Sequence, residues 1–264
     1  MKYGIKFDMP NETYHANDGF LSSSRIKMIL QSPEMYYKKY ILKELKSDSC
    51  EAFDTGTAIH TRILEPNLFE REVTFFSGRK QGIKWEEFQE KNKGKVILGD
   101  IQKIQIERMY KAYLESKIAP PIMEGGESEV SLYTQLDGFD IKVRADRLHI
   151  EKGLVIDLKS TSGLIEKEKF RYNLESRQYG YDLSAALYVD AFSKYYNQKF
   201  EFIWIVLSKD FNDIKCFKAT PNLIEQGRKK YKEAFKLITE YSLNNWDFSE
   251  KIIDIGPSNN FLGE

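Results

Sequence analysis

The stretch VRADRLHIEKGLVIDLKST, residues 143–161, predicts two short β-strands joined by a turn at Lys152-Gly153. Asp157 and Lys159 lie two positions apart on the second strand, so their side chains are expected to project from the same face. A carboxylate and an ammonium on an apolar strand are costly to bury unless they have partners. Taken alone, the pattern is more typical of an ion pair on a surface strand.

The preceding strand adds a second carboxylate. If Lys152-Gly153 forms a two-residue turn, Asp146 lies opposite Lys159 and diagonal to Asp157, about 7–8 Å away, whereas a three-residue turn would move Asp146 to the other face. Two carboxylates beside a lysine form an oxygen-ligand site for a hard divalent cation such as Mg²⁺. Such a cation can polarise a phosphate and activate water, so the pattern indicates hydrolysis of a phosphodiester.

Two further residues are candidates for the same site. Glu129 opens an earlier predicted strand, where it is either a third acidic group or an exposed glutamate at a sheet edge. His60 ends the motif GTAIH on a helix predicted over 51–65, and a histidine in such a helix is more often packed or exposed than bound to a metal. His149 alternates with Asp146 along its strand and is expected to point away.

The remaining segments predict one α/β domain with a mixed sheet flanked by helices. Strands are predicted over 129–136, 139–150, 154–159, 200–208 and 214–219, and helices over 20–45 (in two pieces), 51–65, 100–117, 163–196 and 221–245. Residues 77–95 are predicted as a loop around a short helix. We interpret residues 1–264 as a single domain, with a largely helical portion over 1–120, the sheet core over 121–220, and a helix and tail over 221–264.

Composition narrows the class of protein. The 264 residues are 41% hydrophobic and 30% charged, which is typical of a globular chain and excludes collagen-like or wholly disordered proteins. The 40 basic and 40 acidic side chains cancel, which argues against non-specific coating of polyanions. Cys50 and Cys216 are too few for a disulfide framework or a four-cysteine cluster. With no membrane-length apolar run and no signal peptide, we predict a cytoplasmic protein that does not enter membranes.

Taken together and in order, these motifs resemble the RecE-like exonucleases (the exonuclease VIII family) within the PD-(D/E)xK nuclease superfamily. The matching segments are Tyr14-His15, LSSSRIKMILQSPEMYY (21–37), GTAIHTRILEP (56–66), ESEVSLY (127–133), Arg144–Asp146, Asp157–Lys159 and GYDLSAALYVD (180–190). The resemblance implies a restriction-endonuclease-like core and a Mg²⁺-dependent exonuclease, with Mn²⁺ expected to substitute. It also implies 5′-to-3′ digestion of linear double-stranded DNA, which leaves 3′ single-stranded overhangs for recombination by strand annealing.

Site residues follow from the same resemblance, position by position. Asp146 and Asp157 are implied as metal ligands and Lys159 as the catalytic lysine, with His60 near or on the metal. Glu129 is implied as a further catalytic acid that binds a second ion or the terminal nucleotide.

Contacts with the DNA end are implied for the last matching segment. The family usually carries glutamine four residues before tyrosine there, and Ser184 and Tyr188 occupy these positions in this chain. Ser184 departs from the pattern, and Gln178 upstream could compensate.

The densest basic patch is a separate candidate for contact with DNA. It comprises Arg79, Lys80, Lys84, Lys93 and Lys95, with Trp85 available to stack on an unpaired base. A solvated charged loop explains the patch equally well, because three glutamates intervene.

The resemblance further implies a homo-oligomer, with a ring-shaped tetramer as one form, and a single-strand annealing protein as partner in phage or prophage recombination. Two alternatives stay open at this point. One is a structure- or site-selective endonuclease of the same superfamily, and the other is a non-catalytic DNA-binding protein with a relict site. The intact Asp146, Asp157 and Lys159 argue against the second.

Overall fold

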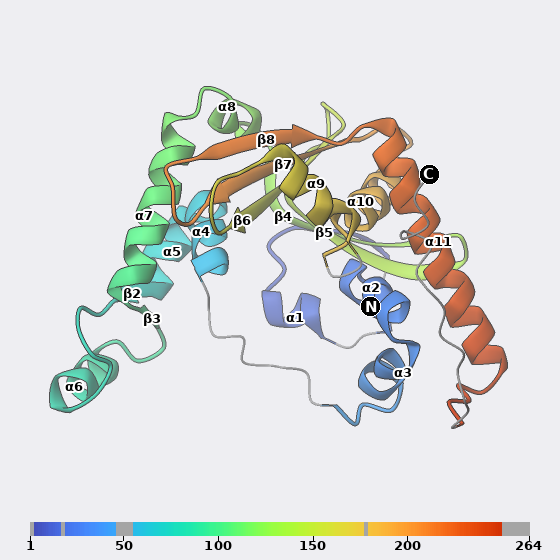
Figure 1. The fold of residues 1–264 in the computed structure, drawn as a ribbon, viewed down its shortest axis with the longest axis horizontal. Coiled ribbons are helices and arrows are strands. Elements are labelled where there is room, and N and C mark those ends of the chain that lie inside the picture. Colours follow the sequence, from blue (N-terminus) through green and yellow to red (C-terminus); the bar gives the residue numbers. More distant parts are fainter. Residues whose placement is uncertain (1–2, 17–18, 46–54, 177–178, 250–264) are drawn as a thin grey trace, which may run out of the picture.

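The structure, a computed structural model, describes residues 3–16, 19–45, 55–176 and 179–249. A six-stranded mixed sheet forms its centre, with the strand order β1-β4-β5-β6-β7-β8 (Figure 1). The strands are β1 (Gly4–Lys6), β4 (Glu127–Leu136), β5 (Phe139–His149), β6 (Leu154–Thr161), β7 (Glu201–Ser208) and β8 (Ile214–Lys218). Within this six-stranded sheet β6 and β7 pair in parallel and the other neighbours are antiparallel, so the predicted mixed sheet is confirmed.

Helices pack on both faces of the sheet and make up most of the N-terminal portion. They are α1 (Asn11–His15), α2 (Ser23–Gln31), α3 (Pro33–Tyr36), the π-helical turn η1 (Tyr37–Ile41), α4 (Thr55–Leu64), α5 (Pro66–Glu72), α6 (Ile83–Lys91), α7 (Asp100–Glu115), α8 (Ala119–Met123), α9 (Lys167–Glu175), α10 (Tyr181–Tyr196) and α11 (Pro221–Leu243). The single helical region predicted over 163–196 is in fact two helices, α9 and α10. Within the described ranges, no helix is both long and apolar enough to cross a bilayer.

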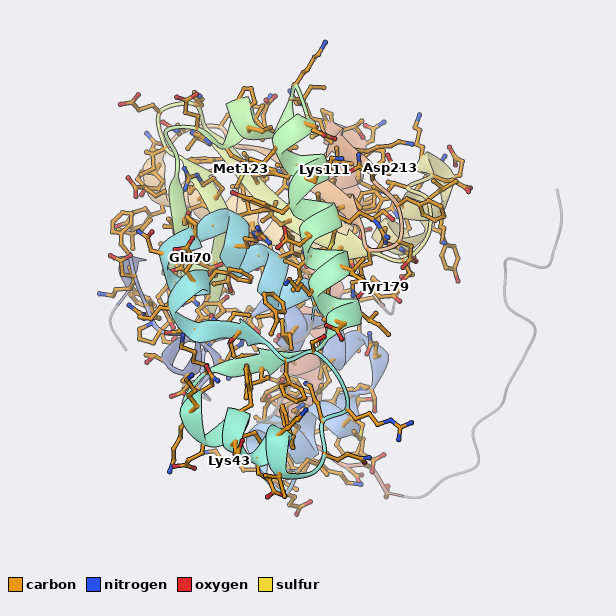
Figure 2. All side chains as sticks on the ribbon, turned by 90° about the vertical axis from the view of Figure 1, so that its left-hand side faces the viewer. Lys43, Glu70, Lys111, Met123, Tyr179 and Asp213 are labelled. Carbon is orange, nitrogen blue, oxygen red and sulfur yellow. The ribbon has the colours of Figure 1, made fainter. Side chains whose placement is uncertain are left out.

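A second, two-stranded sheet was not predicted. Its strands β2 (Val73–Phe75) and β3 (Val96–Leu98) pair in parallel and carry α6 between them. Figure 2 shows this arm below α7, which runs along the front of the molecule in that view. The short helix predicted within 77–95 is therefore confirmed, and it lies at the end of the arm.

Alternation along the strands separates the apolar core into two layers. On one face, α2, α10 and α11 pack over side chains that include Val155, Trp204 and Val206. On the other face, α4 and α8 pack over Ile156, Leu158 and Ile205. Figure 1 shows the two helical groups on either side of the sheet. Side chains on β6 therefore point alternately to helices on both faces, as period-two alternation requires.

Local signals in the sequence explain where several helices begin. Ser22 caps α2 by accepting the N–H of Arg25, and Ser32 caps α3 by accepting the N–H of Met35. Thr220 caps α11 in the same way, and Pro221 follows it in the first turn, where no N–H is needed.

Helices α10 and α11 approach each other closely at Gly227. A Cβ at this position would lie 2.2 Å from the backbone oxygen of Asp182 and 2.8 Å from the Cβ of Ala186. Both distances are well inside van der Waals contact, so only glycine allows this helix spacing. The close approach also brings Lys230 Nζ within 2.6 Å of Asp182 Oδ2.

We predict that Gly227→Ala destabilises the protein, although alanine is the better helix former by about 1 kcal/mol. The added methyl group must push the helices apart, and overpacking of this kind costs typically about 1–3 kcal/mol. Urea unfolding measures the difference. Lys229→Ala, at an exposed position of the same helix, is the control and should change stability by less than about 0.5 kcal/mol. Equal stabilities for the two variants would contradict the packing argument.

His149 is a buried base at the end of β5. It is 4% exposed, its ring lies against Gly126, and its Nε2 has no hydrogen-bond partner among the residues that the structure describes. Burial lowers the pKa of His149, and a hydrogen bond with the backbone of Ile122 only partly opposes this effect. The folded protein therefore favours the neutral imidazole.

This lowered pKa predicts that acid destabilises the protein in part through His149. Above the unfolded-state pKa of about 6.5 the residue contributes no pH dependence, and below it protonation favours the unfolded chain. Each pKa unit between the two states corresponds to about 1.4 kcal/mol. Urea unfolding at pH 7.5 and pH 5.5 should show a larger loss of stability for the wild-type chain than for His149→Gln. Equal losses would mean that His149 titrates alike in both states.

Candidate active site

Three carboxylates occupy one row across the neighbouring strands β4, β5 and β6. The register pairs position 128 with 147 and 130 with 145, which brackets Glu129 and Asp146. On the other side, β5 and β6 pair up to positions 147 and 156, so the next pair in that register would be Asp146 with Asp157. The three acids are therefore separated in sequence but lie side by side on adjacent strands.

The turn between β5 and β6 corrects one prediction. The expected two-residue turn at Lys152-Gly153 is wrong, because His149 pairs with Leu154 and residues 150–153 form a four-residue loop. The N–H of Gly153 closes the loop on Ile150 O at 3.1 Å, with Gly153 at φ +58°. The register shifts by two positions, so every side chain keeps its face. As a result, Asp146 faces Asp157 instead of Lys159.

Lys159 and Asp157 form an ion pair, with 2.5 Å between Nζ and Oδ2. The ammonium also lies 5.3 Å from the ring centroid of Tyr181, at the start of α10. Burial disfavours the charged lysine, but Asp157 and Asp146 outweigh it and hold the pKa of Lys159 above its ordinary value. Lys159 is therefore an ammonium at neutral pH.

Asp146 links β5, β6 and α4. Its Oδ2 accepts the backbone N–H of Leu158 at 2.7 Å and lies 3.7 Å from Nδ1 of His60. Burial raises the pKa of Asp146, and the negative charge of Asp157 raises it further. The structure thus places His60 beside the carboxylates.

Glu129 has an unusual backbone conformation, with φ +51°. Its Oε2 lies 3.6 Å from Nη1 of Arg144. Burial raises the pKa of Glu129 to about 8, with the charge of Asp146 as the next cause, and Arg144 opposes both. Arg144 also donates to Ser131 Oγ at 2.7 Å and to Met9 O at 2.8 Å, so it fixes Glu129 relative to the N-terminal segment.

The DNA-contact candidates on α10 lie in two different environments. Tyr188 lies near the carboxylates. Burial first, and then the charges of Asp157 and Asp146, raise its pKa to about 12. A hydrogen bond joins it to Ser23 on α2. Ser184 instead bonds locally: its Oγ donates to O of Gly180, the N-cap of α10, at 3.4 Å.

Gln178, the residue proposed to compensate for Ser184, lies outside the described residues.

The basic patch is not part of this row. Arg79, Lys80, Lys84, Trp85, Lys93 and Lys95 all lie on the arm around α6, which projects away from β5 and β6 (Figure 1). Lys80 Nζ donates to Ile97 O at 2.7 Å and lies 5.6 Å from the ring of Trp85. Trp85 also packs edge-on against Phe76, with 5.1 Å between ring centroids. One face of the indole is therefore engaged within the arm.

The donor set fits a hard divalent cation. Among the described residues, no three side chains of histidine, cysteine, aspartate or glutamate lie close enough together to enclose a metal ion as they stand. The buried Asp157 Oδ2 has no partner among the described residues apart from the ammonium of Lys159. A buried carboxyl whose pKa is raised by a neighbouring carboxylate, as at Asp146 and Glu129, is an environment that a bound cation stabilises.

Sequence reasoning gave no role to several residues at this site. Arg144 belongs to the matching segment Arg144–Asp146, but its contact with Glu129 depends on the backbone conformation of residue 129, for which the sequence offers no signal. Ser23 and Tyr181 reach the site from helices whose packing is a long-range property. The available indication was the position of Arg144 in an alternating strand, where a buried arginine requires an acidic or polar partner.

Comparison with solved structures supports the fold. A crystal structure of a "putative exonuclease" from Eubacterium rectale superposes with a TM-score of 0.62 at 15% identity, and the match covers 96% of this chain and 97% of that one. A second structure, of SSO0001, has a TM-score of 0.26 at 14% identity and covers 66% of this chain and 84% of that one, which is too low to indicate a shared fold. Among curated proteins, none matches the chain.

A family model described as "PDDEXK-like domain of unknown function (DUF3799)" matches residues 22–246. The matched segment contains α2, the whole carboxylate row, Lys159 and α10. The chain therefore belongs to this PDDEXK-like family.

Proposed function

We propose that this protein is a divalent-metal-dependent nuclease that hydrolyses phosphodiester bonds of linear double-stranded DNA. The observation that carries the proposal is the row of Glu129, Asp146 and Asp157 on adjacent strands, with Lys159 2.5 Å from Asp157. Membership of the PDDEXK-like family supports it, because this arrangement lies within the matched segment.

Asp146 and Asp157 are the proposed principal metal ligands, with His60 and Glu129 at the margins of the site. Mg²⁺ is the proposed cation, and Mn²⁺ the expected substitute. When bound, the cation would polarise a phosphoryl oxygen and lower the pKa of a water molecule. The N–H of Leu158 holds the Asp146 carboxylate in place, so this ligand is oriented before any ion arrives.

Lys159 supplies a fixed positive charge. As an ammonium it cannot accept a proton from water, so its proposed role is to donate hydrogen bonds to the negative charge that develops on the phosphate. The ring of Tyr181 faces the ammonium of Lys159, and Tyr188 borders the carboxylates with a hydroxyl that keeps its proton.

Within this activity we propose a 5′-to-3′ exonuclease that produces 3′ single-stranded overhangs. The similarity in fold to a putative exonuclease from Eubacterium rectale supports exonuclease activity. The direction of digestion and the overhangs rest on the resemblance to RecE-like exonucleases. The substrate would be the end of a DNA duplex. A homo-oligomer and an annealing protein as partner stay predictions from the same resemblance.

Asp157→Asn and Lys159→Met should each reduce Mg²⁺-dependent release of nucleotides from linear duplex DNA by at least about 100-fold, because each removes a charge at the reacting phosphate. Asp137→Asn and Lys229→Met are matched controls at exposed positions and should retain wild-type rates. Chelation should abolish the activity, and Mn²⁺ should restore it. Full activity in both site variants would rule out this site.

End-labelled linear duplex and closed circular duplex separate the remaining possibilities. We expect the linear molecule to be shortened progressively from its 5′ ends while the circle stays intact. Nicking of the circle would instead support an endonuclease. Binding of duplex without turnover in either Mg²⁺ or Mn²⁺ would support a relict site.

A further inference from the structure

A cavity of about 180 Å³ adjoins the candidate active site between α2, α10 and α11. Its lining includes Lys27 and Leu30 from α2, Ser176 and Gly180 ahead of α10, and Lys230 and Glu233 from α11. Tyr181 connects it to the site, because the ammonium of Lys27 lies 5.7 Å from the Tyr181 ring and that of Lys159 lies 5.3 Å from the same ring.

Lys27 differs from the other lysine of the cavity. Lys230 Nζ donates to Asp182 Oδ2 at 2.6 Å and to Glu175 O at 2.8 Å, so its charge is compensated. For Lys27, the described part of the chain provides no ion pair and no hydrogen-bond acceptor. Burial lowers the pKa of Lys27 to about 8, and the positive charge of Lys159 contributes to the shift. An uncompensated ammonium in such a place is costly unless an anion joins it.

The beginning of α10 adds a second source of positive potential. This helix has 16 residues, and its N-cap is Gly180, which has no side chain to accept the first N–H groups. Gly180 lines the cavity, and a Cβ there would meet the Lys27 side chain at 3.4 Å. A helix N-terminus favours an anion, so the helix and the lysine act on the same space.

We propose that this cavity binds a phosphate group of the DNA strand that is being cut. The inference rests on the proposed nuclease function, and it assigns Lys27 as a substrate-binding residue beside the reacting phosphate. Phosphate is the anion that a DNA substrate offers at every step along its backbone. Glu233 is exposed and Asp182 is paired with Lys230. The charges of Asp157 and Asp182 favour the ammonium of Lys27. Burial and the charge of Lys159 outweigh them, so the pKa of Lys27 is still lowered.

The test is the salt dependence of duplex binding, measured by fluorescence anisotropy in EDTA so that no turnover is needed. Loss of one phosphate contact should weaken binding by Lys27→Met roughly 10-fold and reduce the slope of log K against log[salt] by about 1. Lys27→Arg should keep the wild-type slope. Lys229→Met removes one exposed charge from α11 and should also keep it.

Thermal unfolding separates this role from a structural one. Because Lys27→Met removes a partly buried charge that has no ion pair among the described residues, the free variant should be at least as stable as wild type. Retained slope and affinity in Lys27→Met would overturn the proposal, and so would a lowered melting temperature combined with an unchanged slope.

The same duplexes with 5′-phosphate and 5′-hydroxyl ends locate the bound group. An effect of Lys27→Met on both ends assigns the cavity to a backbone phosphate, and an effect only on phosphorylated ends assigns it to the terminal phosphate. The nuclease proposal is judged separately by Asp157→Asn. If the wild-type protein cleaves DNA and Lys27→Met binds duplex normally, the cavity proposal alone is refuted.

Discussion

The hydrogen bond from the N–H of Leu158 to the carboxylate of Asp146 is the contact on which the site depends. It joins β5 to β6 at the point where their backbone ladder stops, so a side chain replaces a backbone partner there. Leu158 lies between Asp157 and Lys159, and its own side chain is anchored in the apolar layer of the opposite face. One bond therefore fixes the first carboxylate and also the strand segment that carries the second carboxylate and the lysine. Orientation of this kind, present before substrate arrives, is what electrostatic catalysis requires.

Burying so many charges is possible because segments distant in sequence supply partners. Arg144 holds Glu129 from one side and the backbone of the N-terminal segment from the other. His60 on α4 lies beside Asp146. Tyr188 on α10, which is hydrogen-bonded to Ser23 on α2, borders the carboxylates from the other direction. Burial first, and then repulsion from a neighbouring carboxylate, still raises the pKa values of Asp146 and Glu129. That residual repulsion favours a cation more strongly than a neutral polar site would.

Much of this arrangement could be predicted from the sequence because strand alternation is a local property. Alternation alone placed Asp157 and Lys159 on one face, and the two-residue error in the turn did not disturb Asp146, since a shift of two preserves the face. The turn itself could not be predicted, because Lys-Gly fits several loop lengths. The parallel pairing of β2 and β3 was missed for a different reason: strands of three residues show no periodicity, and their pairing is set by tertiary contacts. The chemical roles of the site residues remain predictions that the proposed experiments address.

Glu129 shows that fold and chemistry impose opposing demands on one residue. Its left-handed backbone suits glycine or asparagine, and a glutamate there carries a conformational cost of order 1 kcal/mol. Selection for thermal robustness alone would replace it with one of those residues, and the carboxylate would disappear with it. Glutamate at this position keeps the third acid of the row despite the unfavourable backbone conformation. Variants made more stable by replacing residue 129 would therefore bind divalent ions more weakly.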